Sequence, residues 1–318
     1  MRRYLALYLV PLSFVVTVTT RARANEETFK TIDFPGASLT IAVGVNPRGD
    51  IVGQYDSAGM THGFLLSGDE FTSIDFPGAS FTLAEGINPG GDIVGRYISA
   101  GVTHGFLLSG DEFTSIDFPG ASLTSALGIN SREGIVGRYE SAGVSHGYLL
   151  SGGEFTSIDF PGASFSLPHG INPSGDIVGY YDTAGARHGY LFRRNSFAAI
   201  DFPGSSLTIA WGINPRGDIV GRYDSAGVTH GFLLSGDDFT SIDFPGASFT
   251  VAFGIKPRGD IVGYYMTAGV SHGFLLSREG EDDGQNDGGH DSGHHHDHRI
   301  TLRVLPGITT TTAKSEGF

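Results

Sequence analysis

The chain has 318 residues, with 34 acidic against 20 basic side chains, a formal net charge of −14 and no cysteine. The lack of thiols excludes thiol catalysis, disulfide bonds and thiolate metal sites. An acidic chain without a basic cluster is a poor binder of nucleic acid or of anionic membranes, so we expect neither as a partner.

The first 24 residues have the features of a secretory signal peptide. Arg2 and Arg3 precede the apolar run Tyr4–Val18, and Ala22-Arg23-Ala24 follows as a small-x-small cleavage site. The run is shorter than the roughly 20 residues that a membrane-spanning helix needs. We therefore expect a secreted or periplasmic protein with no membrane span after cleavage. An uncleaved membrane anchor is the alternative.

Residues 25–277 are built from one unit that recurs six times at a period of 42 residues. In the second unit, four β-patterned runs lie at Ser80–Asn88, Asp92–Ser99, Thr103–Ser109 and Glu112–Phe118. The turns between them are so short that they join only antiparallel neighbours, which excludes a parallel β-helix. Four-stranded sheets repeated at this period are typical of propeller blades. The sequence thus predicts an all-β fold, a closed six-bladed β-propeller of four-stranded antiparallel blades.

The two ends of the repeat region predict how the ring closes. The region starts with a fourth-strand pattern, Thr28–Phe34, and finishes with a third-strand pattern, Ser271–Ser277. We expect the first run to complete the sixth blade beside the last one, because this pairing hides two sheet edges that would otherwise invite association. We therefore expect a monomer.

Three short motifs recur in the blades and carry a resemblance to a known family. In the second unit they are Gly86-Ile87-Asn88, Asp92-Ile93-Val94-Gly95 and His104-Gly105-Phe106. In these motifs the chain resembles secreted bacterial proteins with HAF-type repeats, although it has His-Gly-Phe or His-Gly-Tyr where that family has His-Ala-Phe. The resemblance covers the six repeats and implies a secreted propeller-like protein. It implies no activity.

A Tyr–His–Asp row crosses the last three strands of every blade. In the second blade the turn lengths place Tyr97 opposite His104 and His104 opposite Asp117; in the first blade the same row is Tyr55, His62 and Asp75. A histidine between a carboxylate and a hydroxyl resembles a proton-relay fragment. The row occurs six times, however, so we expect a structural tie like the buried Asp–His networks of WD-repeat blades.

Positions that differ between blades are the places where a single functional site would lie. One position of the first strand holds Val43, Glu85, Leu127, His169, Trp211 and Phe253, and one position of the second strand holds Asp56, Ile98, Glu140, Asp182, Asp224 and Met266. The fourth blade also carries Arg187 and Arg193-Arg194 on an otherwise acidic chain. The candidate ligand-binding residues are Glu85, Glu140, His169, Arg187 and Trp211. Drift at loosely packed positions is the alternative.

The C-terminal segment, residues 278–318, changes in composition, and we expect it to be disordered apart from a short β-like run at Ile300–Leu305. Five of its residues are candidate ligands for zinc, nickel or copper: His290, His294, His295, His296 and His298. Nothing in the sequence preorganises them, so we expect at most weak metal binding and no other cofactor.

Three classes of function remain open. Near-identical blades favour a non-catalytic secreted binding module, multivalent toward glycans or cell-surface polymers. A glycosidase or lyase with one asymmetric site is the alternative, and it would need paired carboxylates, for which Glu85 and Glu140 are the candidates. The third class is a purely structural surface protein.

Overall fold

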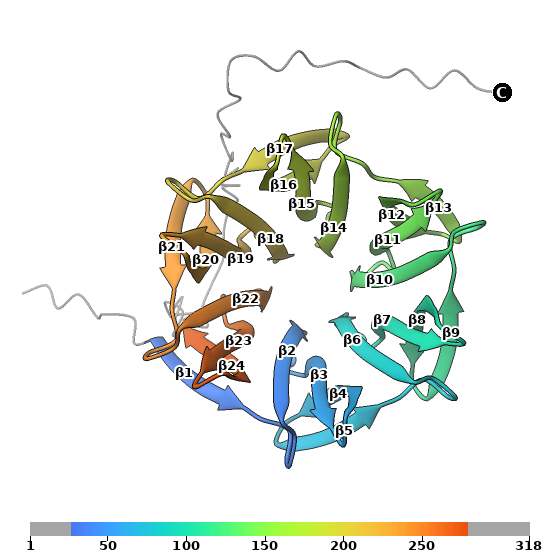
Figure 1. Ribbon diagram of the computed structural model, residues 1–318, viewed down its shortest axis with the longest axis horizontal. Coiled ribbons are helices and arrows are strands. Elements are labelled where there is room, and N and C mark those ends of the chain that lie inside the picture. The colour runs from blue at the N-terminus through green and yellow to red at the C-terminus, as the bar shows by residue number, and fades with distance from the viewer. Residues whose placement is uncertain (1–26, 279–318) are drawn as a thin grey trace, which may run out of the picture.

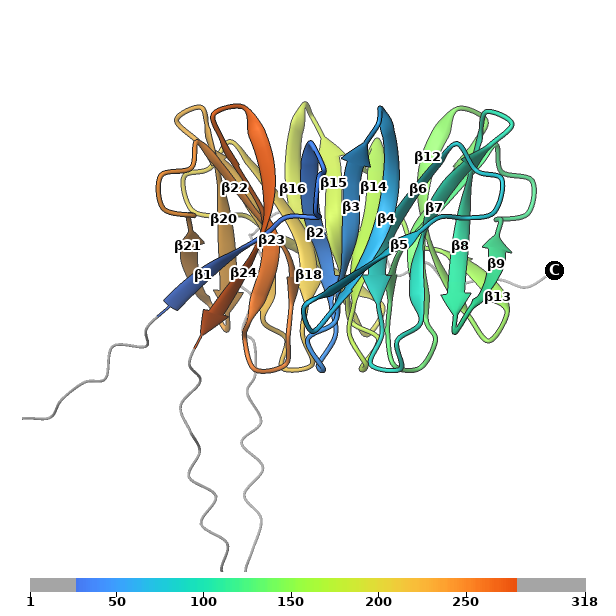
Figure 2. The same ribbon diagram turned by 90° about the horizontal axis from the view of Figure 1, so that it is seen from below.

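The computed structural model of the protein describes residues 27–278, and every regular element in this range is a β-strand. The strands form six four-stranded antiparallel sheets arranged as blades around one axis (Figure 1). Figure 2 shows the ring from its side, as a short cylinder in which the blades stand next to one another. The predicted closed six-bladed β-propeller is thus confirmed.

Each blade contributes four strands, counted here from the axis outward. The first strands are β2 (Leu39–Val45), β6 (Phe81–Ile87), β10 (Leu123–Ile129), β14 (Phe165–Ile171), β18 (Leu207–Ile213) and β22 (Phe249–Ile255). The second strands are β3 (Ile51–Ser57), β7 (Ile93–Ser99), β11 (Ile135–Ser141), β15 (Ile177–Thr183), β19 (Ile219–Ser225) and β23 (Ile261–Thr267). The third strands are β4 (Met60–Ser67), β8 (Val102–Ser109), β12 (Val144–Ser151), β16 (Ala186–Arg193), β20 (Val228–Ser235) and β24 (Val270–Arg278). The fourth strands are β5 (Glu70–Ile74), β9 (Glu112–Ile116), β13 (Glu154–Ser157), β17 (Ser196–Ile200), β21 (Asp238–Ile242) and, in blade six, β1 (Glu27–Ile32).

The ring closes by pairing its two ends. Strand β1 lies antiparallel to β24 in a register that runs from Glu27 opposite Arg278 to Ile32 opposite Gly273. Arg278 also donates through Nε to the Glu27 carboxylate at 3.0 Å. Figure 1 shows β1 as the outer strand of the last blade. This is the closure that the sequence predicts, and it leaves no unpaired edge on the third strand of blade six.

The fourth strand of blade two ends two residues earlier than the sequence pattern suggests, at Ile116 rather than Phe118. The backbone N–H of Phe118 donates to Thr124 Oγ1 at 3.0 Å instead of pairing with β8. The Phe118 ring stacks on Tyr139 of blade three with centroids 3.6 Å apart. The chain leaves the sheet there because this aromatic side chain belongs to the core of the next blade.

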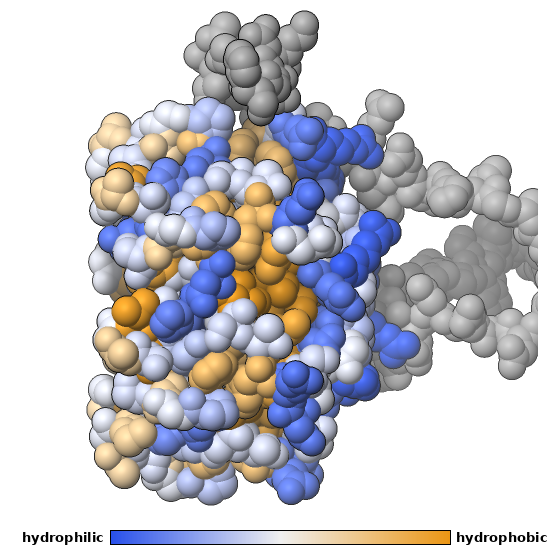
Figure 3. Space-filling model, turned by 90° about the vertical axis from the view of Figure 1, so that its right-hand side faces the viewer, coloured by the Kyte–Doolittle hydropathy of each residue, from blue (hydrophilic) through white to orange (hydrophobic). Residues whose placement is uncertain are grey.

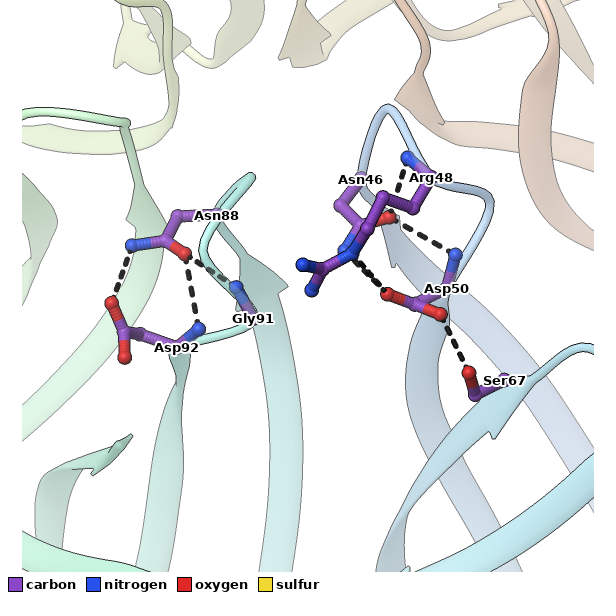
Figure 4. A network of polar contacts seen from close by, with 7 residues as sticks. All are labelled: Asn46, Arg48, Asp50, Ser67, Asn88, Gly91 and Asp92. Atoms are coloured by element: carbon purple, nitrogen blue, oxygen red, sulfur yellow. Dashed lines mark hydrogen bonds and ion pairs between the residues drawn. The ribbon is translucent and has the colours of Figure 1, made fainter. Parts of the chain in front are cut away.

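The turn between the first and second strands is held by an asparagine side chain (Figure 4). In blade one, Asn46 Oδ1 accepts from the backbone N–H groups of Arg48 and Asp50, both at 3.0 Å, and Asn46 Nδ2 donates to Asp50 Oδ2 at 2.8 Å. Ser67 donates to the other oxygen of Asp50 at 2.7 Å and so ties the turn to β4. Asn88 and Asp92 repeat the arrangement in blade two.

The core consists of layers between neighbouring blades. In one layer Val52 and Ile74 of blade one pack against Ile93, Tyr97 and Phe106 of blade two. The second strand lies very close to the first: a Cβ added at Gly95 would overlap the carbonyl oxygen of Leu83 and the ring of Phe106. This close approach explains why a glycine stands at that position in every blade.

The two rims of the cylinder differ in polarity. The turns between second and third strands carry exposed apolar side chains at one rim: Met60, Val102, Val144, Val228 and Val270. The opposite rim, which carries the asparagine turns, is strongly hydrophilic; it is the blue side at the right of Figure 3. We call the first the apolar rim and the second the polar rim.

Candidate functional site

The Tyr–His–Asp rows have the predicted register but not the predicted hydrogen bonds. Tyr97 lies opposite His104, and His104 Nδ1 lies 2.7 Å from Asp117 Oδ1. The Tyr97 hydroxyl, however, bonds to Ser115 Oγ at 2.6 Å, and its ring stacks on the imidazole at 5.1 Å. No hydroxyl in the row reaches the histidine. The histidine therefore bonds its aspartate but does not bridge a carboxylate and a hydroxyl.

The rows are also more exposed than a buried network. The side chains of His104 and Asp117 are 27% and 51% exposed. The His–Asp contact recurs in all six blades at 2.7 to 3.0 Å, in the pairs His62–Asp75, His104–Asp117, His146–Asp159, His188–Asp201, His230–Asp243 and His272–Asp33. Six matching surface pairs fit a structural tie, and no blade has a row with the geometry of a catalytic relay.

The first-strand position that varies between blades faces the axis because of a β-bulge. In blade two the register shifts between Ala84 and Gly86, which leaves Glu85 unpaired. The same shift occurs in every blade. The six bulge residues, which we call the bulge ring, are Val43, Glu85, Leu127, His169, Trp211 and Phe253. As Figure 1 shows, the strands that carry them are the innermost ones.

Side chains of the bulge ring meet across the axis. The rings of His169 and Trp211 lie 4.6 Å apart, and those of Trp211 and Phe253 lie 5.3 Å apart. The His169 and Phe253 rings are 6.3 Å apart, although they come from blades four and six, which are not neighbours. Such a contact requires both side chains to point at the axis. The structure thus brings three variable residues into one aromatic cluster.

A second set of side chains stands beside the bulge ring. It comes from the second-strand residue that pairs with the third residue of each first strand, as Arg96 pairs with Leu83. This set, which we call the strand ring, comprises Gln54, Arg96, Arg138, Tyr180, Arg222 and Tyr264. Tyr180 lies 5.5 Å from Trp211 and Tyr264 lies 5.8 Å from Phe253 between ring centroids. The two rings together form the axial cluster.

Charge in the axial cluster is unevenly compensated. Arg96 Nε lies 3.4 Å from Glu85 Oε1, and the Glu85 side chain is only 11% exposed. Burial lowers the pKa of Arg138, and the nearby charge of Arg96 lowers it further. Burial also lowers the pKa of His169. Because the carbonyl oxygen of Trp211 only accepts, His169 Nδ1, 3.1 Å away, must donate, which leaves Nε2 of the neutral ring as an acceptor.

Buried donors without a partner gather at this cluster. Among the described residues, seven buried side-chain atoms make no hydrogen bond within the protein, and four of them lie here: Arg96 Nε, Arg222 Nε, Trp211 Nε1 and Ser125 Oγ. The other three are Ser145 Oγ and the hydroxyl groups of Tyr148 and Tyr190. Ser125 pairs with Arg138, so all four atoms belong to the axial cluster or its direct neighbours. A buried donor left unsatisfied costs about 1–3 kcal/mol. Four such atoms at the axial cluster make it the candidate site.

The sequence-predicted candidates converge on this region. Glu85, His169 and Trp211 belong to the bulge ring, and the charge of Glu85 raises the pKa of His169. Arg187 lies over the Tyr180 ring at 4.7 Å and bonds Asp182 through Nε and an η nitrogen, at 2.7 and 2.8 Å. The charge of Glu140 raises the pKa of Arg138.

The strand ring was missed by the sequence reasoning. Its signal was present: the middle residue of the constant Gly-x-Tyr motif changes among glutamine, arginine and tyrosine. From the sequence alone, variation at one position between invariant neighbours cannot be told from variation at an ordinary surface position. Only the three-dimensional ring shows that these six residues face one another.

A cavity of about 330 Å³ lies away from the axis, between blades five and six at the polar rim, and Arg216, Asp218, Arg258 and Arg278 help to line it. Its Asp218 carboxylate is already bonded by Asn214, Arg216 and Ser235 at 2.7 to 3.2 Å. Four of the seven unpartnered buried donors of the described residues lie at the axial cluster instead, so we place the candidate site there.

Two predictions concern residues outside the described range. The histidines proposed to bind metal, at 290, 294, 295, 296 and 298, and the signal peptide at 1–24 lie outside residues 27–278. Within the described range no three histidine, aspartate or glutamate side chains are grouped so that they could hold a metal ion. No helix in that range is long and apolar enough to cross a membrane.

Comparison with known proteins supports the fold alone. No protein-family profile and no curated protein sequence matches the chain. Among solved structures, the β-propeller domain of the trilobed protease from Pyrococcus furiosus is similar with a TM-score of 0.50 and 11% identity, over 76% of this chain and 83% of that one. Virginiamycin B lyase from Staphylococcus aureus with quinupristin is similar with a TM-score of 0.49 and 10% identity, over 79% of this chain and 100% of that one. The PQQ-bound aldose sugar dehydrogenase from Streptomyces coelicolor is similar with a TM-score of 0.48 and 12% identity, over 80% of this chain and 99% of that one.

Proposed function

We propose that the protein is a secreted, non-catalytic binding protein that holds a glycan at the propeller axis. The observation that carries the proposal is the axial cluster, where half-buried aromatic rings and unpartnered buried donors meet at positions that differ between the blades. Known binding sites combine mostly apolar walls with a few placed polar groups in this way.

The chemistry of a sugar matches these groups. A sugar ring has an apolar C–H face, which an aromatic ring covers, and hydroxyl groups around its edge, which need donors and acceptors. Trp211, Tyr180 and Tyr264 supply half-buried aromatic surface. Trp211 Nε1 is a free donor, and His169 Nε2 is an acceptor.

One axial site fits the structure better than several equivalent sites around a rim. Polar groups near the apolar rim are occupied within the protein: each row histidine bonds its aspartate, and Asp56 and Asp224 accept from Thr61 and Thr229 at 2.6 and 2.7 Å. The side chains of the bulge ring, in contrast, meet at the axis. The ligand therefore makes one asymmetric set of contacts, and a glycan or cell-surface polymer would be held through one of its residues.

An enzyme remains the alternative because Glu85 and His169 are an acidic and a basic group at the same site. Glycoside hydrolysis uses two carboxyl groups on opposite sides of the scissile bond. At the axis Glu85 is paired with Arg96, and Glu140 stands on the second strand of blade three, next along from Tyr139 of the row. Nothing in this arrangement presents two free carboxyl groups to one bond.

A binding screen tests the proposal. The mature protein is titrated by calorimetry with a panel of plant, algal and bacterial polysaccharides, and the products are assayed for new reducing ends. Trp211→Leu, which installs the residue that blade three has at the equivalent position, should weaken binding at least about tenfold, or 1.4 kcal/mol. Val102→Met, which installs the residue of blade one at an exposed position of the apolar rim, is the matched control and should bind within about twofold of the wild type.

Two results would overturn the proposal. One is the absence of binding to every glycan in the panel by a protein whose melting curve shows that it is folded. The other is equal binding by the wild type and Trp211→Leu, which would place the ligand elsewhere. New reducing ends that depend on Glu85 would replace the binding function by catalysis.

A further inference from the structure

Three of the six strand-ring residues are arginines, and only one of them, Arg96, has a carboxylate of the described residues within ion-pair distance. Arg96, Arg138 and Arg222 come from blades two, three and five, at equivalent positions of β7, β11 and β19. Repeat symmetry sets them at the same height along the axis. Elsewhere a blade has glutamine or tyrosine at this position. Nothing in the propeller fold itself requires a charge here.

None of the three arginines makes a hydrogen bond to a carboxylate within the described residues. Arg96 Nε is 3.4 Å from Glu85 but is not aligned for a hydrogen bond, and no ion pair forms at Arg138 or Arg222 within residues 27–278. Several other arginines in the described range are paired with a carboxylate. Arg48 reaches Asp50 at 3.1 Å, as Figure 4 shows, and Arg193 reaches Asp176 at 2.8 Å.

Most of the acidic groups near the strand ring are already engaged. One residue further along the second strands stand Asp56, Glu140, Asp182 and Asp224. Three of these four carboxylates accept hydrogen bonds from the third strand: Asp56 from Thr61, Asp182 from Arg187 and Asp224 from Thr229. Glu140 is the fourth, and its charge acts on Arg138 without a direct contact. The guanidinium groups of the strand ring keep free donors.

Two of these arginines repel each other. The pKa of Arg138 is lowered first by burial and then by the charge of Arg96. Like charges held together in a partly desolvated place are costly unless an anion lies between them. Arginine is suited to that role because its planar fork binds carboxylate or sulfate through two parallel hydrogen bonds.

We propose that the axial site selects acidic glycans, and that Arg96, Arg138 and Arg222 bind the carboxylate or sulfate group of a sugar whose ring packs on Trp211 and Tyr180. This inference rests on the proposed glycan-binding function and names its ligand class. The aromatic rings recognise the sugar, and the three guanidinium groups recognise its charge. A neutral sugar also offers acceptor oxygens to the buried Nε atoms of Arg96 and Arg222, but only a carboxylate or sulfate compensates the positive charge of the three guanidinium groups.

The test uses polymers that differ only in charge. Polygalacturonate is compared with the same polymer after reduction of its carboxyl groups, and dextran sulfate is compared with dextran, by calorimetry in low and moderate salt. The site should bind at least one acidic polymer about tenfold or more tightly than its neutral partner, with affinity falling as salt rises. The pair that shows the difference identifies carboxylate or sulfate as the charged group.

Matched variants separate the site from general charge. Arg222→Gln, which installs the residue of blade one, should reduce affinity for the acidic polymer about tenfold or more. Arg132→Gln removes the same charge from an exposed position in the asparagine turn of blade three, on the polar rim, and should change it less than about twofold. Melting curves of both variants check that the propeller is intact.

The outcomes distinguish this inference from the function on which it rests. Equal binding of acidic and neutral partners overturns the inference but leaves glycan binding standing. Equal loss in Arg222→Gln and Arg132→Gln also overturns it, since attraction by the whole surface would then explain the preference. If no polymer binds at all, the proposed function falls, and the inference falls with it.

Discussion

Removing one aspartate from the His–Asp rows gives a prediction whose size follows from the structure. In blade two, Asp117→Ala removes the partner of His104 Nδ1, 2.7 Å away. The aspartate is 51% exposed and the imidazole 27%, so water replaces much of what is lost. Exposed pairs of this kind contribute about 0.2–1 kcal/mol. A buried tie would cost more, about 1–3 kcal/mol, because a desolvated group would be left unsatisfied.

Blade three provides an internal comparison. There Asp159 bonds His146 at 2.9 Å and in addition accepts from the backbone N–H of Gly147 at 3.1 Å. Asp159→Ala should therefore cost about 0.5–1.5 kcal/mol more than Asp117→Ala. For a domain of this size each kcal/mol lowers the melting temperature by about 2–4 °C. The double variant of Asp117 and Asp201, from distant blades, should be additive within about 0.3–0.5 kcal/mol.

Urea unfolding of all six single aspartate variants measures these free energies, provided that the dependence of the unfolding free energy on urea concentration is the same as in the wild type. The reasoning is refuted if Asp117→Ala costs more than about 3 kcal/mol, which would mean a buried network. It is also refuted if Asp159→Ala costs no more than the others. A variant that keeps its stability but loses ligand binding would show that its row is functional rather than structural.

Three further perturbations test other parts of the fold. Deleting β1 (Glu27–Ile32) exposes the edge of β24, so the shortened chain should aggregate or unfold at a lower temperature; a monomeric elution profile with unchanged melting would show that closure is dispensable. In the wild type, stability should fall as the pH drops below about 6.5, because the unfolded His169 imidazole binds a proton that the buried native ring does not. The free energy of unfolding should fall by at most about 1.4 kcal/mol per pH unit, and His169→Leu should remove this loss. Urea midpoints between pH 5 and 8 measure this, and a wild-type-minus-variant difference that does not change with pH would contradict it. Gly95→Ala places a methyl group against the carbonyl oxygen of Leu83 and should cost about 1–3 kcal/mol; an unchanged melting temperature would show that the two strands separate easily.

The architecture could be predicted from the sequence because each of its causes is local and repeated. Short turns such as Ala100-Gly101 join only antiparallel neighbours, and both residues have the positive φ that a two-residue hairpin requires. The fixed period then multiplies the blade, and the order of the terminal runs decides the closure through β1 and β24. The early end of the fourth strand of blade two was not predictable, since it depends on the packing of Phe118 on Tyr139 in the neighbouring blade.

The site could be predicted only in part. Variation between blades pointed to Glu85, His169 and Trp211, because a break in a repeat is visible along the chain. The contact between His169 and Phe253, 6.3 Å apart and 84 positions apart in the sequence, depends on bulges that aim both side chains at the axis. A bulge has no reliable local signature, so the role of the strand ring, with Arg96 and its equivalents, emerges only when the ring is closed.

The most direct test of a ligand at the axis uses Trp211, the only tryptophan in the chain. Its indole stands between His169 and Phe253 with a free Nε1–H, so its emission reports what enters the axial cluster. Titration with the acidic glycan that binds in calorimetry should change the emission saturably, with the same midpoint as the heat signal. Binding by calorimetry with unchanged Trp211 emission would contradict the account, because the ligand would then lie somewhere other than the axis.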